Sequence, residues 1–412
     1  MIQELKYTCV FYTRTETYYT TNMKIDNVFL GKISNNDIYK TLNGSNCSGI
    51  FLDIETTGLK RDRDTVYLIG IMYPCTKDSD PDFNIRLFFA ESPLEEKDIL
   101  RELSLFLEDY KKDSGINLSF ITFNGDRFDI PFLKARFLLN NIPCPAALAD
   151  TVHTDIYKLI KPYRKYFGLS HLNQKSIEKL LKINREDTYT GGELINVYKE
   201  YSGNKDPELY KLLITHNRDD VYGMSGILPV ISYSYIFSRV KSDNRINSDD
   251  RSYSIIRSGV DSHISFDGTE VKEFIIEFHL PCRVPVPHLF HNDRIFLSVN
   301  ENTGVLRLPV FEGELKHYFD NYKDYYYIPS EDRAILKTLG SLMDPETCEK
   351  AKADNCYIRF SGDFLPLSKE DRSITIYRPE RKCNFCYGRL EDIKNTPDLR
   401  EYLINIIAYA FS

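Results

Sequence analysis

The first half of the chain alternates short apolar runs with polar turns. Three runs in succession have the length and the β-branched and aromatic content of buried strands, and their spacing predicts an antiparallel meander. A helical pattern follows over residues 92–112, where Ser92 and Glu95 match a capping pattern, and a fourth strand comes after it. The four runs, in order, are GIFLDIE, VYLIGIMYP, NIRLFFAES and NLSFITFNG.

The remaining residues divide the chain into segments. Residues 155–222 are mostly helical in pattern, a polar and charged stretch follows, and the chain then becomes β-rich with two helical patterns, around 331–353 and 389–411. The order of elements predicts an α/β domain, a mixed sheet flanked by helices, with a smaller C-terminal α+β domain. The predicted segments are a strand-rich leader (1–47), the main domain (48–235), a linker (236–264) and the accessory domain (265–412).

Composition places the chain among ordinary folded proteins. Its 412 residues favour two domains, and the hydrophobic fraction of 42% and charged fraction of 27% suit a globular protein with a core. The net charge of −7 counts against a protein that coats DNA nonspecifically. It is compatible with an enzyme that grips a few nucleotides, because metal-binding carboxylates themselves add negative charge.

The cysteines and the apolar runs bear on the cellular compartment. The nine cysteines are odd in number and scattered, which argues against a disulfide scaffold. The first residues lack the apolar core of a signal peptide, and no run of about 18 apolar residues occurs, so we expect a cytoplasmic protein that does not enter a membrane. Cys383 and Cys386 form a C-x-x-C pair, but a structural zinc site needs two more ligands, so we interpret them as reduced thiols.

Asp53 and Glu55 stand at the end of the first apolar run. Residues two apart on a strand point to the same face, so the two carboxylates should lie side by side. Carboxylates that are this close repel each other unless a cation lies between them. The alternative is a solvent-facing strand end with two ordinary acidic residues.

Two further acidic positions have plain interpretations when each is taken alone. Asp129 follows the fourth strand and a glycine turn, close to the start of a helix, where an aspartate often caps the helix. His216 and Asp220 lie one helical turn apart and share a face, which an ordinary polar helix surface would also show. Asp219 points elsewhere on that helix, and we expect it to be solvated.

Together, these positions resemble the motifs of the DEDD superfamily of 3′–5′ exonucleases, which have the ribonuclease H-like fold. The likeness covers about residues 48–225, and the segments between the motifs resemble the YprB-like branch of predicted prokaryotic nucleases. The resemblance implies that Asp53, Glu55, Asp129 and Asp220 bind metal. The matching stretches are DIETTGL, NGDRFDIPFL and HNRDDV.

His216 departs from the pattern of the superfamily. Members usually place a Tyr four residues before the last Asp, or a His five before it, whereas here His216 stands four before Asp220 and Thr215 occupies the usual His position. Two roles stay open for His216. It orients or deprotonates the attacking water, or it only hydrogen-bonds Asp220.

The negative charge that builds up in phosphodiester hydrolysis and the resemblance together imply two cations. Ions about 3.5–4 Å apart can activate a water molecule and stabilise the leaving oxygen of a phosphodiester. Asp53, Asp129 and Asp220 would share one ion, and Asp53 and Glu55 would hold most of the other. Oxygen ligands favour Mg²⁺ or Mn²⁺ over Zn²⁺.

By the same resemblance, the substrate is DNA or RNA, bound at a single-stranded 3′ end. Thr56, Gly58 and Leu59 are expected to meet the terminal nucleotide, and Asn124 to touch the strand. Two basic clusters could face phosphates, with a solvated charged surface as the alternative. They comprise Lys60, Arg61 and Arg63, and Lys161, Arg164 and Lys165 with Tyr163 and Tyr166 between them.

Other functions stay open from the sequence. The same metal site could serve a structure-selective endonuclease, or the domain could bind nucleic acid without catalysis, although all four carboxylates are present. Residues 265–412 could instead act as a protein-interaction platform. Within them, the run from Tyr325 to Tyr327 could stack on bases, but packing within a core is the preferred interpretation.

Overall fold

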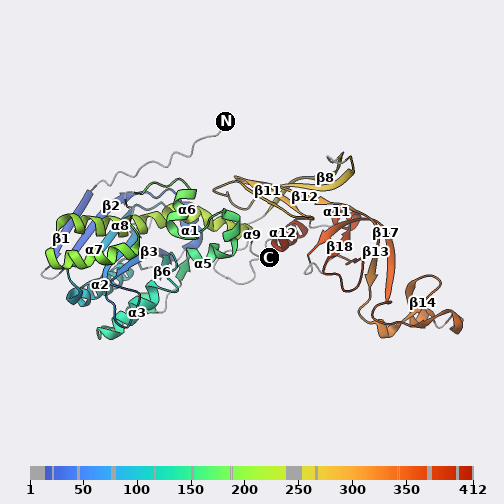
Figure 1. Ribbon diagram of the computed structural model, residues 1–412, viewed down its shortest axis with the longest axis horizontal. Coiled ribbons are helices and arrows are strands. Elements are labelled where there is room, and N and C mark those ends of the chain that lie inside the picture. The colour runs from blue at the N-terminus through green and yellow to red at the C-terminus, as the bar shows by residue number, and fades with distance from the viewer. Residues whose placement is uncertain are drawn as a thin grey trace. The chain divides into compact units, whose positions relative to one another are not determined.

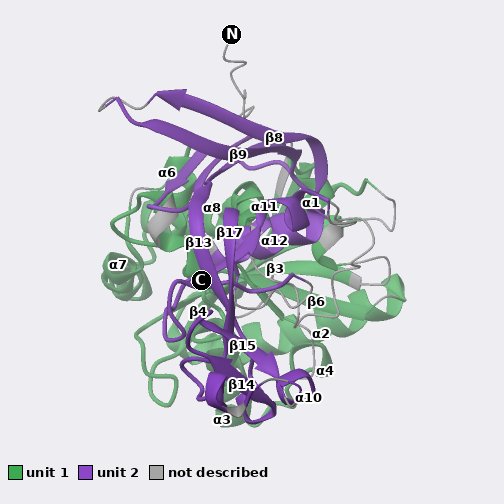
Figure 2. Ribbon diagram, turned by 90° about the vertical axis from the view of Figure 1, so that its right-hand side faces the viewer, with its two compact units in different colours: residues 1–234, 242–248 green, residues 235–241, 249–412 purple. Residues whose placement is uncertain are grey.

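The structure is a computed structural model of the chain, which consists of two compact units (Figure 2). Unit 1 comprises residues 1–234 and 242–248, and unit 2 comprises residues 235–241 and 249–412. The residues that the structure describes are 14–20, 23–43, 47–75, 80–115, 117–149, 153–185, 187, 189–237, 253–264, 268–340, 342, 344–368, 374–395 and 399–410.

Unit 1 is built on a seven-stranded mixed sheet (Figure 1). Neighbouring strands are antiparallel along the sheet as far as β3, and the last two pairings, β3 with β6 and β6 with β7, are parallel. The predicted meander and the fourth strand are confirmed. In sheet order, the strands are β1 (Arg14–Thr20), β2 (Met23–Gly31), β5 (Phe83–Ala90), β4 (Val66–Pro74), β3 (Cys47–Thr56), β6 (Asn117–Thr122) and β7 (His153–Asp155). The strands β1 and β2, which fall within the predicted leader, therefore extend the same sheet.

Helices cover both faces of this sheet. The face that carries Ile50, Leu52 and Ile54 packs on the first group of helices, and the face that carries Phe51 and Asp53 packs on the second. The first group comprises α2 (Glu96–Ser114), α3 (Asp129–Leu139) and α4 (Ala146–Ala149), and the second comprises α1 (Asn36–Asn43), α7 (Gly191–Asn204) and α8 (Pro207–Ile227). Short helices complete unit 1: η1 (Pro93–Glu95), α5 (Ile156–Ile160), η2 (Lys161–Phe167), α6 (Gln174–Leu180) and η3 (Leu228–Ile231), with α9 (Ser232–Phe237) at its boundary with unit 2.

Local sequence signals set the ends of the two longest helices. The side chains of Ser92 and Glu95 form the predicted capping box ahead of α2. Gly115 ends this helix with a φ of 61°, in the left-handed region that favours glycine. The side chain of Asp206 accepts a hydrogen bond from the amide of Glu208, and Pro207 occupies the first position of α8. These signals place the start of α8 three turns before the residues of the third motif.

Unit 2 consists mainly of antiparallel strands in three sheets. The first sheet has the order β10 (His288–His291), β11 (Phe296–Asn300), β12 (Thr303–Pro309), β9 (Glu270–His279) and β8 (Ser254–Ile264). The second has the order β13 (Phe311–Tyr318), β17 (Tyr357–Leu367) and β18 (Cys386–Arg389), and the third has the order β15 (Arg333–Leu336), β14 (Tyr325–Ile328) and β16 (Glu349–Lys350). Strand β8 thus occupies the last part of the predicted linker.

Two expectations for the helices of unit 2 had different outcomes. The helical pattern at 389–411 is confirmed by α11 (Leu390–Lys394) and α12 (Leu399–Ala410). The prediction of a helix around 331–353 is wrong. The first residues of this segment form β15, which pairs with β14, and the helical residues described there are those of α10 (Lys337–Gly340) and the one-turn η6 (Pro345–Thr347). Cross-strand pairing with a tyrosine-rich strand outweighs a weak local helical preference.

The tyrosine run in β14 packs within unit 2, as its preferred interpretation expected. Tyr325 stacks on Phe319 with ring centroids 4.5 Å apart, and the hydroxyl of Tyr327 donates to Asp332 over 2.5 Å. Within the described part of the chain, every helix falls short of the length or the hydropathy that a membrane span requires.

Two of the leucines on α2, one buried and one exposed, test the placement of the core. Leu103 is 1% exposed within the core cluster, whereas Leu105 on the same helix is 53% exposed. We expect Leu103→Ala to lower the free energy of unfolding of unit 1 by about 2–5 kcal/mol. Leu105→Ala should change it by no more than about 0.5 kcal/mol. Urea denaturation of the two variants and the wild-type protein measures both values, and equal losses would contradict the described packing.

Candidate active site

Asp53 and Glu55 extend from β3 toward α8, on one face of the sheet. The amide Nδ2 of Asn217 donates to Oδ2 of Asp53 over 2.7 Å, and Nε2 of His216 lies 3.2 Å from Oε1 of Glu55. Both partners are neighbouring residues of α8. The prediction that the two carboxylates share a face is therefore confirmed.

Asp129 reaches the same strand from the first turn of α3. Its Oδ1 accepts a hydrogen bond from the amide of Ile54 over 3.2 Å, which places this carboxylate against the backbone between Asp53 and Glu55. Asp129 is the first residue of the helix, and Phe128 is the N-cap. The plain alternative, an aspartate that caps its own helix, is not the arrangement in the structure.

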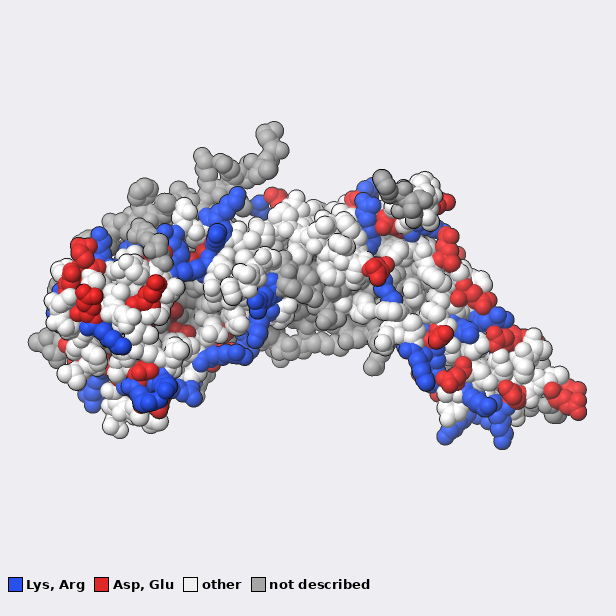
Figure 3. Space-filling view, viewed as in Figure 1, with Lys and Arg blue, Asp and Glu red and all other residues white. Residues whose placement is uncertain are grey.

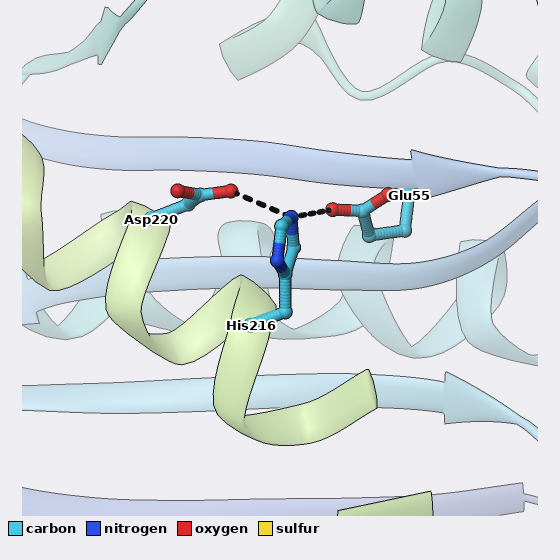
Figure 4. A group of neighbouring side chains, drawn as sticks. All are labelled: Glu55, His216 and Asp220. Carbon is cyan, nitrogen blue, oxygen red and sulfur yellow. Dashed lines mark ion pairs between the residues drawn. The ribbon is translucent and has the colours of Figure 1, made fainter. Parts of the chain in front are cut away.

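His216 links Glu55 to Asp220, as Figure 4 shows. Nε2 of His216 lies 3.1 Å from Oδ2 of Asp220, one turn along α8, and 3.2 Å from Oε1 of Glu55. The other ring nitrogen, Nδ1, lies 2.7 Å from Oδ2 of Asp187. Both ring nitrogens thus contact carboxylates. This geometry fits the role of His216 as a hydrogen-bond partner of Asp220, and it adds Glu55 and Asp187 as partners.

The surroundings of His216 favour its charged form. Burial lowers the pKa of the imidazole, but the hydrogen bonds and charges of Asp220 and Glu55 outweigh burial and raise the pKa to about 11. With carboxylates beside both ring nitrogens, these surroundings favour the imidazolium form, which donates to the carboxylates and holds them in place.

The four carboxylates have unequal surroundings. Burial, followed by the charges of Asp220, Asp129 and Glu55, raises the pKa of Asp53 well above its usual range. Burial likewise raises the pKa of Glu55, and it raises that of Asp129 to about 7. Burial also opposes ionisation of Asp220, but the hydrogen bond from His216 and the charge of Arg185 outweigh it and lower the pKa of Asp220.

A glycine on β4 allows α8 to approach the sheet. A Cβ atom added to Gly70 would lie 2.0 Å from Oδ1 of Asn217 and 2.8 Å from Cγ2 of Val221. Gly70 pairs with Asp53 across β3 and β4. The absence of a side chain at this position therefore brings Asn217 within hydrogen-bond distance of Asp53.

Several residues of the site were not foreseen from the sequence. Arg185 and Asp187 come from the segment between α6 and α7, where no periodic pattern points to them, and Asn217 lies inside the third motif. The expectation that Asp219 is solvated is wrong: Asp219 is 7% exposed, and its Oδ2 accepts a hydrogen bond from the amide of Asp187. Asp219 thereby holds the segment that carries Arg185 and Asp187.

The residues expected to meet the substrate occupy the loops beside the carboxylates. Leu59 is 80% exposed, whereas Thr56 is buried and its Oγ1 donates to the carbonyl of Gly58 over 2.7 Å. Asn124 has a φ of 66°, and its backbone N–H donates to Oδ1 of Asp155 over 2.8 Å. Leu59 is thus the member of this group whose side chain is most available for contact.

The two predicted basic clusters have different surroundings. Lys60, Arg61 and Arg63 are exposed in the loop after β3, as are Lys161 and Arg164 in η2. Tyr163 is 6% exposed and packs inside, while the side chains of Lys165 and Tyr166 lie outside the described set. On the face of unit 1 drawn in Figure 3, basic and acidic side chains are interspersed.

Comparison with protein families places this site within a known fold. Residues 50–229 match the model of a family described as the RNase_H superfamily. The matched range includes all four carboxylates, most of β3, and the strands β4, β5, β6 and β7. Unit 1 has an RNase H-like fold. The predicted fold class, a mixed sheet flanked by helices with further antiparallel sheets toward the C-terminus, is confirmed.

Individual proteins resemble the chain less clearly than the family model does. No curated protein matches the chain. Among solved structures, an exonuclease I structure shares 12% identity and a TM-score of 0.31, covering 57% of this chain and 55% of its own. E. coli exonuclease I in complex with a dT13 oligonucleotide shares 11% identity and a TM-score of 0.27, covering 57% and 55%. The chain thus spans little more than half the length of these structures, and similarity at this level carries no inference about activity.

The donor set of the site suits a hard divalent cation. Glu55 and Asp220 each offer a carboxylate oxygen within 4.8 Å of the other, beside the ring of His216, and Asp53 and Asp129 adjoin them through β3. Burial raises the pKa values of Asp53, Glu55 and Asp129, and nearby positive charge would favour their ionised forms. A bound cation would supply that charge, and carboxylate oxygens are the ligands that Mg²⁺ and Mn²⁺ prefer.

The pH dependence of stability tests the burial of Asp129. Because folding raises its pKa to about 7, the stabilising contribution of the protonated group is complete below about pH 4 and is lost as the pH rises toward about 7. Asp129→Asn keeps an acceptor for the Ile54 amide but does not ionise. In EDTA, we expect the wild-type protein to lose stability relative to this variant by an amount on the order of a few kcal/mol across that interval. Urea denaturation at several pH values measures the difference, and parallel pH profiles would contradict the assignment.

Proposed function

We propose that unit 1 is a metal-dependent nuclease that hydrolyses phosphodiester bonds, and that it acts as a 3′–5′ exonuclease of the DEDD type, in the YprB-like branch. The observation that carries the proposal is the meeting of four carboxylates from β3, α3 and α8 at one end of the sheet, within the segment that matches the RNase_H superfamily. The substrate is a nucleic acid, DNA or RNA, entering with a single-stranded 3′ end.

The carboxylates of Asp53, Glu55, Asp129 and Asp220 would hold Mg²⁺ or Mn²⁺, and we propose two ions. Such ions, when bound, lower the pKa of water and neutralise charge that builds up on a phosphate. Without them, these carboxyl groups would offer only neutral or negative groups to a phosphodiester that is itself negatively charged. The dependence of activity on a divalent cation follows from this charge.

The remaining residues of the chain orient groups at the site. His216 donates to Glu55 and Asp220 and holds these two carboxylates beside each other. The amide of Asn217 holds Asp53 in the same way. Leu59, which is exposed beside them, offers an apolar surface to the terminal nucleotide. In this proposal His216 is a residue of the catalytic site that orients its carboxylates.

An Asp53→Asn exchange tests the catalytic assignment. It keeps the shape of the side chain but removes a carboxylate that, in this proposal, both cations share, so cleavage should be abolished with Mn²⁺ or Mg²⁺ present. The matched control is Asp109→Asn, an exposed position on α2, which should cleave like the wild-type protein. Full activity of Asp53→Asn would remove the basis of the assignment. Circular dichroism spectra of the two variants verify that both are folded.

Labelled substrates test the direction and mode of cleavage. Linear single strands of DNA and of RNA, labelled at the 5′ or the 3′ end, are digested with Mn²⁺, beside a circular single strand and a sample with EDTA. We expect early release of mononucleotides from the 3′ end, shortening of the 5′-labelled strand, an intact circle and no reaction in EDTA. Cleavage of the circle would identify an endonuclease instead.

A further inference from the structure

Arg185 is a buried cation beside the proposed metal ligands, and it contacts three carboxylates. Its side chain is 10% exposed. Nη1 lies 2.9 Å from Oε2 of Glu178, and Nη2 lies 2.6 Å from Oδ1 of Asp220 and 3.4 Å from Oδ2 of Asp187. A planar guanidinium with several donors suits such an arrangement, whereas an ammonium group does not match it.

The two oxygens of Asp220 therefore have different partners. Oδ1 binds Arg185, and Oδ2 lies 3.1 Å from His216 Nε2, which also contacts Glu55. Oδ2 is thus the oxygen on the side of the other proposed ligands. With Oδ1 held by a rigid partner, the carboxylate cannot turn about its terminal bond without losing a charge-assisted hydrogen bond.

Arg185 also reaches His216 by a second route. Asp187 Oδ2 lies 2.7 Å from His216 Nδ1 and 3.4 Å from Arg185 Nη2. The four residues Arg185, Asp220, His216 and Asp187 form a closed ring of contacts. Lys175 adds a further cation at 2.8 Å from Asp187 Oδ2. Displacing any member of the ring leaves a buried charge without its partner, which is costly.

We propose that Arg185 is a positioning residue for the metal site: by holding Oδ1 of Asp220 and, through Asp187, the ring of His216, it presents Oδ2 of Asp220 and Oε1 of Glu55 to the cation. This inference rests on the proposed function, because it takes Asp220 and Glu55 as metal ligands. It assigns to the segment between α6 and α7 a role in cation binding. The competing explanation is that Arg185 only fastens this segment to α8.

The chain offers a matched control for the competing explanation. Arg136 on α3 is also 10% exposed at its side chain and binds the buried Glu96, with Nε and Nη2 each 2.7 Å from a carboxylate oxygen. None of its described contacts is with the four carboxylates. Arg185→Lys and Arg136→Lys therefore each keep a positive charge and each lose a buried guanidinium fork.

The experiment measures Mn²⁺ binding to the full-length, metal-free protein by isothermal titration calorimetry, with cleavage of a labelled single strand assayed in parallel. We expect Arg185→Lys to weaken Mn²⁺ binding by about 10–100-fold. Arg136→Lys should bind Mn²⁺ like the wild-type protein, whatever its loss of thermal stability. Asp187→Asn, which leaves the contact of Arg185 with Asp220 in place, should weaken Mn²⁺ binding by a smaller factor and serves as the second variant if Arg185→Lys does not fold.

The outcomes separate this inference from the proposed function. Wild-type affinity for Mn²⁺ in Arg185→Lys, or equal weakening in Arg185→Lys and Arg136→Lys, overturns the positioning role while the nuclease assignment stands. Wild-type affinity in Asp187→Asn overturns the route through His216. Absence of both Mn²⁺ binding and cleavage in the wild-type protein overturns the proposed function, and this inference with it.

Discussion

Buried negative charge at the end of β3 is the constraint on which the rest of unit 1 depends. Glu55 and Asp129 are buried, and the partly exposed Asp53 lies beside them on β3. Ionised carboxylates in such a place cost free energy unless hydrogen bonds or positive charges compensate for the lost hydration. The elements around them, above all α8 and the segment that precedes α7, are arranged so that some of this compensation comes from the chain itself.

The compensation differs among the carboxylates, and this difference sets which of them have raised and which have lowered pKa values. Asp220 has a cationic partner on each oxygen, and its pKa is lowered. Asp53 and Asp129 accept hydrogen bonds from the neutral amides of Asn217 and Ile54, and their pKa values are raised. A divalent cation would therefore be attracted most strongly by Asp53 and Asp129, because the protein provides the least positive charge beside these two carboxylates.

The meander of β3, β4 and β5, the strand β6 and the helix α2 were predictable, because each carries a local signal. The apolar runs of β3, β4 and β5 and the capping residues of α2 are read from neighbouring positions alone. Local signals were weaker in unit 2. The segment at 331–353 shows a helical pattern, yet its start pairs with β14, since the energy of a strand depends on what lies beside it in space.

The sequence by itself singled out the four acids proposed for the site, through their motifs and their resemblance to a family: two on a strand, one at the start of a helix and one a helical turn after His216. Only the tertiary structure decided how each acid is held. Arg185, Asp187 and the buried Asp219 act from positions far from those motifs, and their effect depends on distances through space, because electrostatic and hydrogen-bond energies fall with separation between atoms, whatever their separation along the chain.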